Sequence, residues 1–404
     1  MKRRRIRRAI RRAISKTLIA LIIVMIAVIG VVAYLVLRNP LGSQTTPIVS
    51  TTLTTYTATS QTQQITLIGG GSTAIDPQMQ AWARFYRDEI SKGSVVINYQ
   101  GIGSGAGQKG IIDGSLDFAG SDIPLTKDNY ETLKSSGRGF IQIPVIGMSI
   151  AVVYNIPEWD QSKCGNLRLT PQALAGIYLG KIVYWDDPAI KSVQAPQCQD
   201  LLPHKEIYAV HRSDGSGSTA FFTMYLSKTV PEWNSTVGWG LVVNWPVDAT
   251  GRGIGGKGSP GVIAAVKNTP YSIGYVEPEY ANREGVPIAA LQNKEGNFVL
   301  PTIDNVKEAL RRGAALLPPP DAYWGSVPLA FIYQDGPNTY PMSGTSYIII
   351  STTLPKSKAE ALKAFFTWVL TQGQSDKYVL PGYVPLPKEL ADKALEYINM
   401  LQGK

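Results

Sequence analysis

Three segments, in which a short apolar strand leads through glycines and hydroxyls into a helix, constrain this chain most. One runs from the apolar stretch 206–210 through residues 212–218 into the helical stretch 220–226. The other two follow strand-like stretches at residues 69–73 and 101–107. Short strands that alternate with helices predict an α/β fold with largely parallel sheets. Because a helix start offers unpaired N–H groups and a partial positive charge, three such starts facing one point suit an anion.

The side chains in these segments have an ordinary interpretation as well. Serine hydroxyls at these positions also fit simple helix caps, and this holds for Ser72, Ser104, Ser216 and Ser218. Arg212 offers a planar guanidinium that fits phosphate oxygens, while Asp214 also fits an ordinary turn residue. Asp117 is expected to end its strand as a solvated acid without a ligand role. On the residues alone, both interpretations stay open.

The basic character of the chain comes from its first residues. The whole chain has a formal net charge of +9, and residues 1–16 contain nine Lys or Arg and no acid. Residues 17–404 therefore sum to zero. The folded part gives no electrostatic support for nucleic-acid binding, so no nucleic-acid partner is expected.

An uncharged apolar segment follows this basic tail. Residues 17–37 carry no charge, and at about 1.5 Å per residue they span a hydrocarbon core of roughly 30 Å as a helix. The positive-inside rule then places everything after Arg38 outside the cell, anchored to the cytoplasmic membrane at the cell surface. A cleaved signal peptide is the alternative, and the retained anchor is favoured. Residues 38–63, rich in Ser and Thr, are interpreted as a tether that cannot build a core.

The remaining chemistry-bearing residues favour neither a metal nor a cofactor. Cys164 and Cys198 are the two cysteines, and in an external compartment such a pair favours a disulfide over a metal site. His204 and His211 fit surface or satisfied polar residues. Residues 251–257 have the spacing of a P-loop, but Gly258 stands where Ser or Thr would hold magnesium. No cofactor, metal site or catalytic residue is predicted.

Two apolar strands are suited to pass between lobes. Residues 143–154 predict one long strand, and residues 347–350 predict a second strand that returns to the first lobe. We therefore expect one lobe from residues 64–147 with 340–404, and the other from residues 148–339.

Seven stretches in this order resemble a known family. The chain resembles the periplasmic phosphate-binding proteins of phosphate ABC transporters. The matching stretches are residues 69–73, 98–104, 117–124, 177–182 with 185–187, 212–217, 255–258 and 273–277. Each stretch alone is a weak signal, but together they are specific and cover roughly residues 65–400. The resemblance implies a two-lobed, Venus-flytrap α/β periplasmic-binding-protein fold that holds phosphate between its lobes, here preceded by an N-terminal transmembrane helix.

The resemblance also implies a role for each residue of the site. In the first lobe, Thr73 would donate through its backbone and hydroxyl, Ala74 through its N–H and Ser104 through its hydroxyl, with Ser72 beside them. In the second lobe the phosphate contacts would be Arg212, Ser216, Gly217 and Ser218, with Asp214 holding Arg212. Two departures stand out: Ala74 and Ile75 replace an aromatic residue and proline, and Ser218 replaces threonine.

The resemblance also implies that Asp122 accepts the proton of the phosphate, which makes Asp122 the predicted selectivity residue. A carboxylate that faces an anion is favourable only if the ligand still carries a proton, as hydrogen phosphate does and sulfate does not. An unpaired buried carboxylate would cost on the order of a few kcal/mol against sulfate.

The function expected from these features is capture of inorganic phosphate and its delivery to the permease subunits of an ABC transporter, by a monomer. Two alternatives remain, a secreted phosphatase that uses the same anion cradle and a receptor for another tetrahedral oxyanion. The phosphatase would need a nucleophile with a base or a set of metal ligands, which two histidines do not supply.

Overall fold

The first lobe is built on a five-stranded sheet with strand order β2-β1-β3-β12-β4. The computed structural model describes residues 64–313 and 317–404. The strands of this sheet are β1 (Ile65–Gly71), β2 (Val95–Gly101), β3 (Phe118–Ser121), β4 (Phe140–Ser149) and β12 (Ser343–Ser351). β1 pairs in parallel with β2 and β3, whereas β12 is antiparallel to both β3 and β4. The sheet is therefore parallel on one side and antiparallel where it approaches the second lobe.

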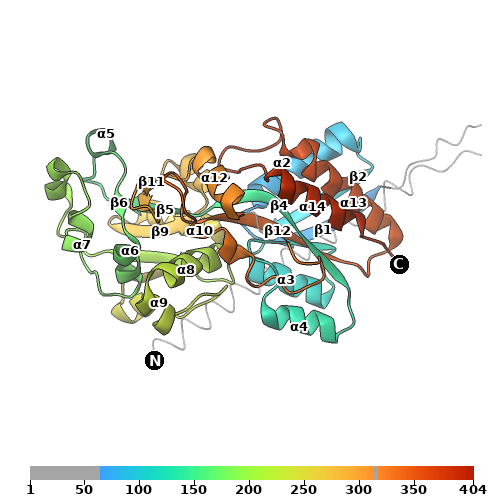
Figure 1. The fold of residues 1–404 in the computed structure, drawn as a ribbon, viewed down its shortest axis with the longest axis horizontal. Helices are drawn as coiled ribbons and strands as arrows, with labels where there is room; N and C mark the ends of the chain where they lie inside the picture. Colours follow the sequence, from blue (N-terminus) through green and yellow to red (C-terminus); the bar gives the residue numbers. More distant parts are fainter. Residues whose placement is uncertain (1–63, 314–316) are drawn as a thin grey trace, which may run out of the picture. The chain divides into compact units, whose positions relative to one another are not determined.

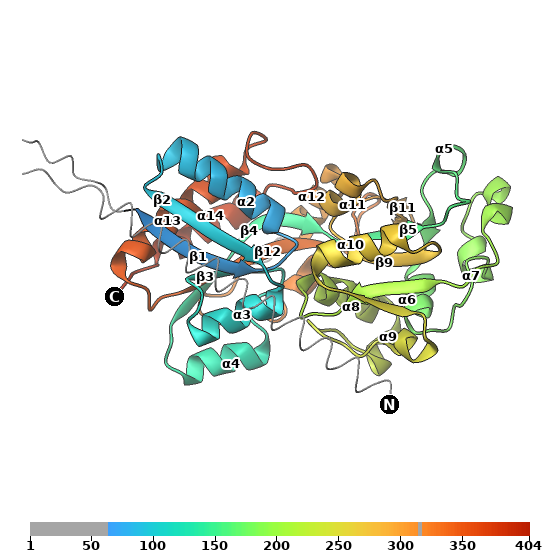
Figure 2. The same ribbon diagram turned by 180° about the vertical axis from the view of Figure 1, so that it is seen from behind.

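Helices lie on both sides of this sheet (Figures 1 and 2). They are α2 (Asp76–Phe85), α3 (Ser104–Asp113), α4 (Lys127–Ser135), α13 (Lys356–Leu370) and α14 (Lys388–Asn399). Aromatic residues in and directly after α2 pack against those of α13, since Trp82 and Phe365 are buried and Tyr86 lies edge-on to Phe365. These contacts join the first and last parts of the described chain into one core.

The second lobe carries a four-stranded sheet with the order β5-β9-β7-β8 and a small sheet with the order β11-β10-β6. Their strands are β5 (Ala151–Asn155), β6 (Arg168–Leu169), β7 (Tyr208–Arg212), β8 (Gly253–Gly256), β9 (Ser272–Val276), β10 (Ala290–Gln292) and β11 (Phe298–Val299). β7 is parallel to β8 and β9, so these three strands end at the same edge. Parallel strands make their carboxyl ends available to a ligand there.

Helices of the second lobe begin where the sequence offers capping residues. They are α5 (Gln161–Cys164), α6 (Pro171–Tyr178), α7 (Pro188–Lys191), α8 (Gly217–Thr229), α9 (Pro231–Thr236), α10 (Gly258–Asn268) and α11 (Pro278–Glu284), followed by α12 (Ile303–Gly313), which packs against β4 and β12. Thr170 caps α6 by accepting the N–H of Ala173, and proline occupies the next position. Cys164 and Cys198 form a disulfide with a Cα–Cα distance of 5.8 Å.

Two neighbouring segments connect the lobes. The strand predicted over 143–154 is in fact two strands, because β4 ends at Ser149 in one sheet and β5 starts at Ala151 in the other. Ile150 lies between them, and its N–H donates to the carbonyl of Met342 just before β12 begins (3.0 Å). The outgoing and returning chains therefore run side by side at the crossing.

The structure contradicts the expectation that Asp117 is a solvated acid. It is 8% exposed and pairs with Lys358 of α13 at 2.8 Å, while the N–H of Ile68 donates to the same carboxylate. The predicted solvated acid is thus a buried carboxylate that, through a partly exposed Lys358, joins β1 to α13.

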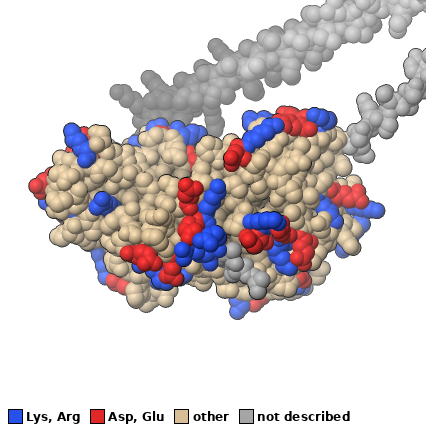
Figure 3. All heavy atoms as spheres, turned by 45° about the horizontal axis from the view of Figure 1, so that its top comes forward, with Lys and Arg blue, Asp and Glu red and all other residues tan. Residues whose placement is uncertain are grey.

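One face of the molecule carries charged side chains of both signs. The face in Figure 3 carries Lys and Arg interspersed with Asp and Glu, without a broad patch of one sign. Among residues 64–313 and 317–404 no helix is long and apolar enough to cross a membrane. The predicted basic tail 1–16, membrane helix 17–37 and tether 38–63 lie outside the described residues.

Candidate functional site

The carboxyl ends of six parallel strands supply the loops of the candidate site. β1, β2 and β3 lead to Ser72, Ser104 and Asp122 in the first lobe. β7, β8 and β9 lead to the segment 212–218, to Gly258 and to Glu277 in the second. Because hydrogen bonds and close contacts join these loops across the lobe boundary, the predicted convergence of helix starts is present in the fold.

Asp122 forms the centre of the first-lobe wall. Its Oδ1 accepts hydrogen bonds from Ser72 Oγ (2.6 Å) and Ser346 Oγ (2.9 Å), and Ser104 Oγ lies 3.3 Å from Oδ2. The carboxyl is almost completely buried, at 1% exposure. Ser346 reaches it because the register of β12 shifts at a bulge between Ser346 and Tyr347, and bulges re-aim side chains in this way. Three hydroxyls, from the residue after β1, the start of α3 and β12, thus hold one carboxylate.

Burial changes the acidity of this carboxyl. Burial raises the pKa of Asp122 to about 6, and the negative charge of Glu277 acts in the same direction. The hydrogen bonds from Ser72 and Ser346 and the charge of Arg212 oppose this rise. Asp122 can therefore exchange a proton with a ligand near physiological pH.

The residues just before α2 are already engaged within the protein. Ser72 Oγ accepts the N–H of Ala74 (3.0 Å), and the carbonyl of Ala74 accepts the hydroxyl of Tyr383. Ala74 and Ile75 are fully buried. The Ala74 N–H, which was predicted to face the anion, thus donates to Ser72 in this structure.

Arg212 and Asp214 form the second-lobe wall. Arg212 is 5% exposed, and its Nε and Nη2 donate to the two oxygens of Asp214 at 2.8 and 2.5 Å. The N–H of Gly258 donates to the same carboxylate (2.9 Å), so α10 helps to hold the pair. A bidentate partner fixes the plane of the guanidinium and leaves its three remaining N–H donors, two on Nη1 and one on Nη2, for a ligand.

The start of α8 supplies further donors. Ser216 is the N-cap, and its hydroxyl accepts the N–H of Thr219 (3.1 Å). Gly217 and Ser218 follow in the first turn, where backbone N–H groups lack partners within the helix. Ser218 Oγ donates to Glu277 Oε1 at 2.6 Å. Ser216 therefore also has the capping role that was left open as the ordinary interpretation.

Direct contacts close the two lobes on each other. The Ser259 N–H donates to Thr73 Oγ1 (3.1 Å), and the Tyr280 hydroxyl donates to the Thr73 carbonyl (2.7 Å). The Gly105 N–H donates to the Gly215 carbonyl (3.0 Å). A Cβ added to Gly217 would lie 2.5 Å from Asp122 Oδ2, so only glycine allows this approach.

The structure brings every predicted binding residue to this boundary. The first lobe contributes Ser72, Thr73, Ala74, Ser104 and Asp122, and the second contributes Arg212, Asp214, Ser216, Gly217 and Ser218. Four neighbours in the site, Ser259, Glu277, Tyr280 and Ser346, were not predicted from the sequence. Glu277 directly follows a strand, as Asp122 does, and that position was the available signal. Ser346 lies within a strand and is placed by the bulge, for which the sequence shows no signal.

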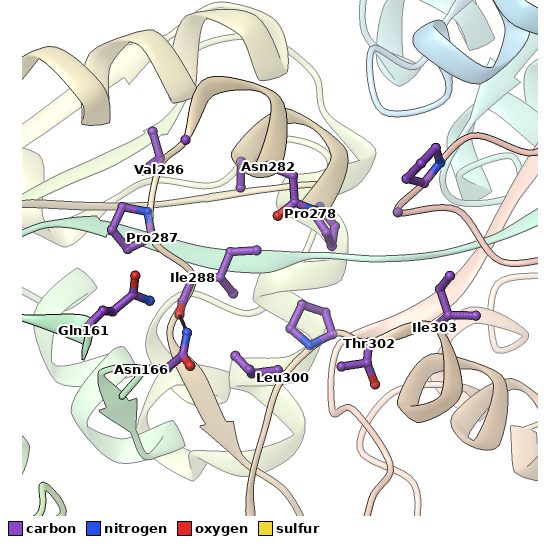
Figure 4. Close-up of a pocket in the computed structure, with 15 residues that line it drawn as sticks. Gln161, Asn166, Pro278, Asn282, Val286, Pro287, Ile288, Leu300, Thr302 and Ile303 are labelled. Carbon is purple, nitrogen blue, oxygen red and sulfur yellow. Dashed lines mark hydrogen bonds between the residues drawn. The ribbon is translucent and has the colours of Figure 1, made fainter. Parts of the chain in front are cut away.

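A separate groove has none of these residues in its lining (Figure 4). It has a volume of about 570 Å³ and is lined by parts of α11, by residues 286–288 and 300–303, and by Pro381 and Gly382. Its polar side chains are amides and one hydroxyl, from Gln161, Asn166, Asn282 and Thr302, and none of its described lining residues is charged. The groove therefore lacks the charged donors that a dehydrated anion requires.

Two α/β lobes that close on an enclosed polar site, joined by adjacent crossing segments, define a solute-binding protein of the periplasmic type. A family model described as a PBP superfamily domain matches residues 56–372. A phosphate-binding protein PstS of Methanocaldococcus jannaschii is 40% identical over 337 residues, which cover 82% of this chain and 85% of the relative. Its counterpart in Pasteurella multocida is 38% identical over 344 residues, covering 84% and 91%. The chain belongs to the PstS family of phosphate-binding proteins.

Solved structures support the fold independently. A high-affinity periplasmic phosphate-binding protein (PfluDING), solved with phosphate, superposes with a TM-score of 0.62 at 22% identity, covering 81% of this chain and 92% of that one. An ancestral soluble variant of the human phosphate binding protein superposes with a TM-score of 0.63 at 20% identity, covering 84% and 99%.

Proposed function

We propose that this protein captures inorganic phosphate between its two lobes and delivers it to the permease of an ABC transporter. Membership of the phosphate-binding family supports this function. The proposal takes residues 64–147 with 340–404 as one lobe and residues 148–339 as the other. Phosphate would contact Thr73, Ser104 and Asp122 on one side, and Arg212 with the start of α8 on the other.

The observation that carries the proposal is the buried carboxylate of Asp122 among donors. Arg212 and the first turn of α8 favour a tetrahedral oxyanion. Asp122 adds an acceptor to this set, and an acceptor is useful only against a ligand that carries a proton. Hydrogen phosphate can donate that proton, whereas sulfate has none to donate at neutral pH. The site therefore favours phosphate over sulfate by on the order of a few kcal/mol.

Closure follows from the same contacts. A ligand held by both walls stabilises the closed arrangement because an open one would break half of its hydrogen bonds, which is hinge closure around a ligand. Direct bonds between the lobes, such as the one from Gly105 to Gly215, add to that preference.

Calorimetric titration of the full chain in mild detergent tests the proposal. Phosphate should bind tightly and sulfate at least about 100-fold more weakly, as a difference of about 3 kcal/mol implies. Asp122→Asn should narrow this ratio. Equal binding of the two anions by the unmodified protein would refute the proposal, and so would the absence of phosphate binding. A parallel assay for phosphate-ester hydrolysis, with no turnover expected, separates a receptor from a phosphatase.

The anchor is part of the same proposal. Residues 17–37 would hold the lobes outside the cell, and the Cys164–Cys198 disulfide supports an oxidising compartment. Protease treatment of intact cells should release the lobes, while N-terminal sequencing of the mature protein distinguishes a retained anchor from a cleaved signal. Light scattering of the purified protein should give a monomer.

A further inference from the structure

Glu277 places a second buried carboxyl group at the phosphate site. It is 2% exposed and directly follows β9, at the N-cap position of α11. Its side chain makes no capping hydrogen bond to that helix. The carboxyl group is therefore available to the site rather than to its own helix.

The two oxygens of this carboxyl group differ. Oε1 accepts the hydroxyl of Ser218 at 2.6 Å, while Oε2 is buried without a hydrogen-bond partner among the described residues. An ionised carboxylate with one oxygen buried and unpaired is costly, whereas the protonated acid is much less so. A proton on this carboxyl group would remove that cost when water is excluded from the site.

The ionisable groups around Glu277 include more acids than bases. The titratable groups that act on it electrostatically are Asp122 across the lobe boundary, Arg212 on β7, Glu279 and Tyr280 on α11, and Tyr383. Arg212 is the one cation in this set, and Asp214 already pairs with it at both oxygens. A phosphate anion at this site would therefore face the carboxyl groups of Asp122 and Glu277, while the positive charge of Arg212 is already compensated by Asp214.

The hydroxyl of Ser218 has a single proton, so its two neighbours compete for it. If Glu277 is ionised, Ser218 donates to Oε1 and can only accept from the ligand. If Glu277 is protonated, its O–H donates to Ser218 Oγ, and the serine proton is free to donate to a phosphate oxygen. Whether Ser218 can donate to phosphate thus depends on whether Glu277 carries a proton.

We propose that Glu277 is a positioning residue whose protonation turns Ser218 into a phosphate donor, so that loading the site takes up a proton. If Glu277 stays ionised, Ser218 can only accept, and phosphate must bring the extra proton itself. In both cases the loaded site holds one more proton than the one that hydrogen phosphate donates to Asp122. This inference rests on the proposed phosphate site and specifies how that site depends on pH.

Calorimetric titration of the full chain with inorganic phosphate tests it. Titration in two buffers of different ionisation enthalpy counts the protons taken up. Above neutrality, where free phosphate is a dianion, each linked proton weakens binding by about tenfold per pH unit. Glu277→Gln should lower both the proton count and the slope of log Kd against pH by about one relative to the unmodified protein. Glu279→Gln is the matched control, because it removes a carboxylate two residues away that does not contact Ser218, and it should change both far less than Glu277→Gln does.

Two further variants keep the outcome decisive. In Ser218→Ala, adding Glu277→Gln should change the slope little, since the residue through which Glu277 acts is gone. If Glu277→Gln does not fold, Asp122→Asn serves instead, and it should still take up a proton on binding phosphate. An unchanged proton count in Glu277→Gln, or none in Asp122→Asn, refutes the role of Glu277 while phosphate binding itself stands. Failure of the unmodified protein to bind phosphate at any pH overturns the proposed function and this inference with it.

Discussion

Gly217→Ala should separate closure of the lobes from the supply of hydrogen-bond donors. Alanine keeps the backbone N–H at the start of α8, so the donor is retained. Its Cβ, however, would lie 2.5 Å from both Cβ and Oδ2 of Asp122. Asp122 cannot turn away easily, because Ser72 and Ser346 hold its carboxylate at 2.6 and 2.9 Å.

The magnitude follows from these distances. Restoring an ordinary contact of about 3.4 Å requires the lobes to separate locally by roughly 0.9 Å, which lengthens hydrogen bonds past their useful range. The bond from Gly105 to Gly215, now 3.0 Å, would be lost, and so would one or two of the bonds from the second lobe to phosphate. Bonds to a charged ligand contribute about 1.5–3 kcal/mol each, so the loss is about 3 kcal/mol, or roughly 100-fold in Kd.

The fold of the second lobe should not suffer. Gly217 is the first residue of α8, and alanine in a helix is favoured over glycine by up to about 1 kcal/mol. The melting temperature without phosphate should stay level or rise slightly. Small-angle scattering should show that phosphate compacts the unmodified protein but not the variant.

Gly105→Ala is the graded comparison. Its Cβ would lie 3.2 Å from Gly215 Cα, an overlap of a few tenths of an ångström, so Kd should rise by less than about tenfold. Unchanged phosphate affinity in Gly217→Ala would refute the reasoning, because the loaded lobes would then not approach as closely as this structure places them.

Three further predictions concern pH and stability. Because the pKa of Asp122 is raised from 3.8 to about 6, its contribution to the stability of the ligand-free fold is present below pH 3.8 and lost as pH rises through about 6. Asp122→Asn should therefore gain up to about 3 kcal/mol on the unmodified protein between acid and neutral pH, and parallel melting curves would contradict this. Reducing the disulfide between Cys164 and Cys198, which are 34 residues apart, should lower the free energy of unfolding by about 4 kcal/mol in denaturant titrations while phosphate affinity changes little. Lys358→Met should cost about 2–3 kcal/mol by leaving Asp117 buried with too few partners, and Asp117→Asn in the same chain should restore most of it; no restoration would argue against the ion pair as the cause.

Local sequence patterns predicted much of the site because its loops are contiguous in the chain. Residues 69–73, 101–107 and 212–218 each combine a strand end, glycines, hydroxyls and a helix start, and each pattern needs only a few neighbouring residues to be recognised. The two-lobed fold followed from these patterns together with the family resemblance. The pairing of Arg212 with Asp214 lay within the same reach, since the two residues share one turn.

Contacts between residues that are distant in the sequence could not be predicted from such local patterns. Asp117 looked like a solvated strand end because its partner Lys358 is 241 residues away. The strand expected over 143–154 divides at Ile150 because two sheets, rather than one, compete for it. An apolar run records that both segments are buried, but it does not record the sheet to which each belongs.

By itself, the sequence determined the α/β class and the order of the strand–glycine–helix loops, since both depend on short-range geometry and on residue type, while the acceptor role predicted for Asp122 came from the family resemblance. Only the tertiary structure decided that Ser346 and Glu277 join that site, one through a bulge and the other through the edge where parallel strands end. The physical reason is that a buried polar group is defined by the partners around it. Those partners come from strands that meet only when the lobes are folded and closed.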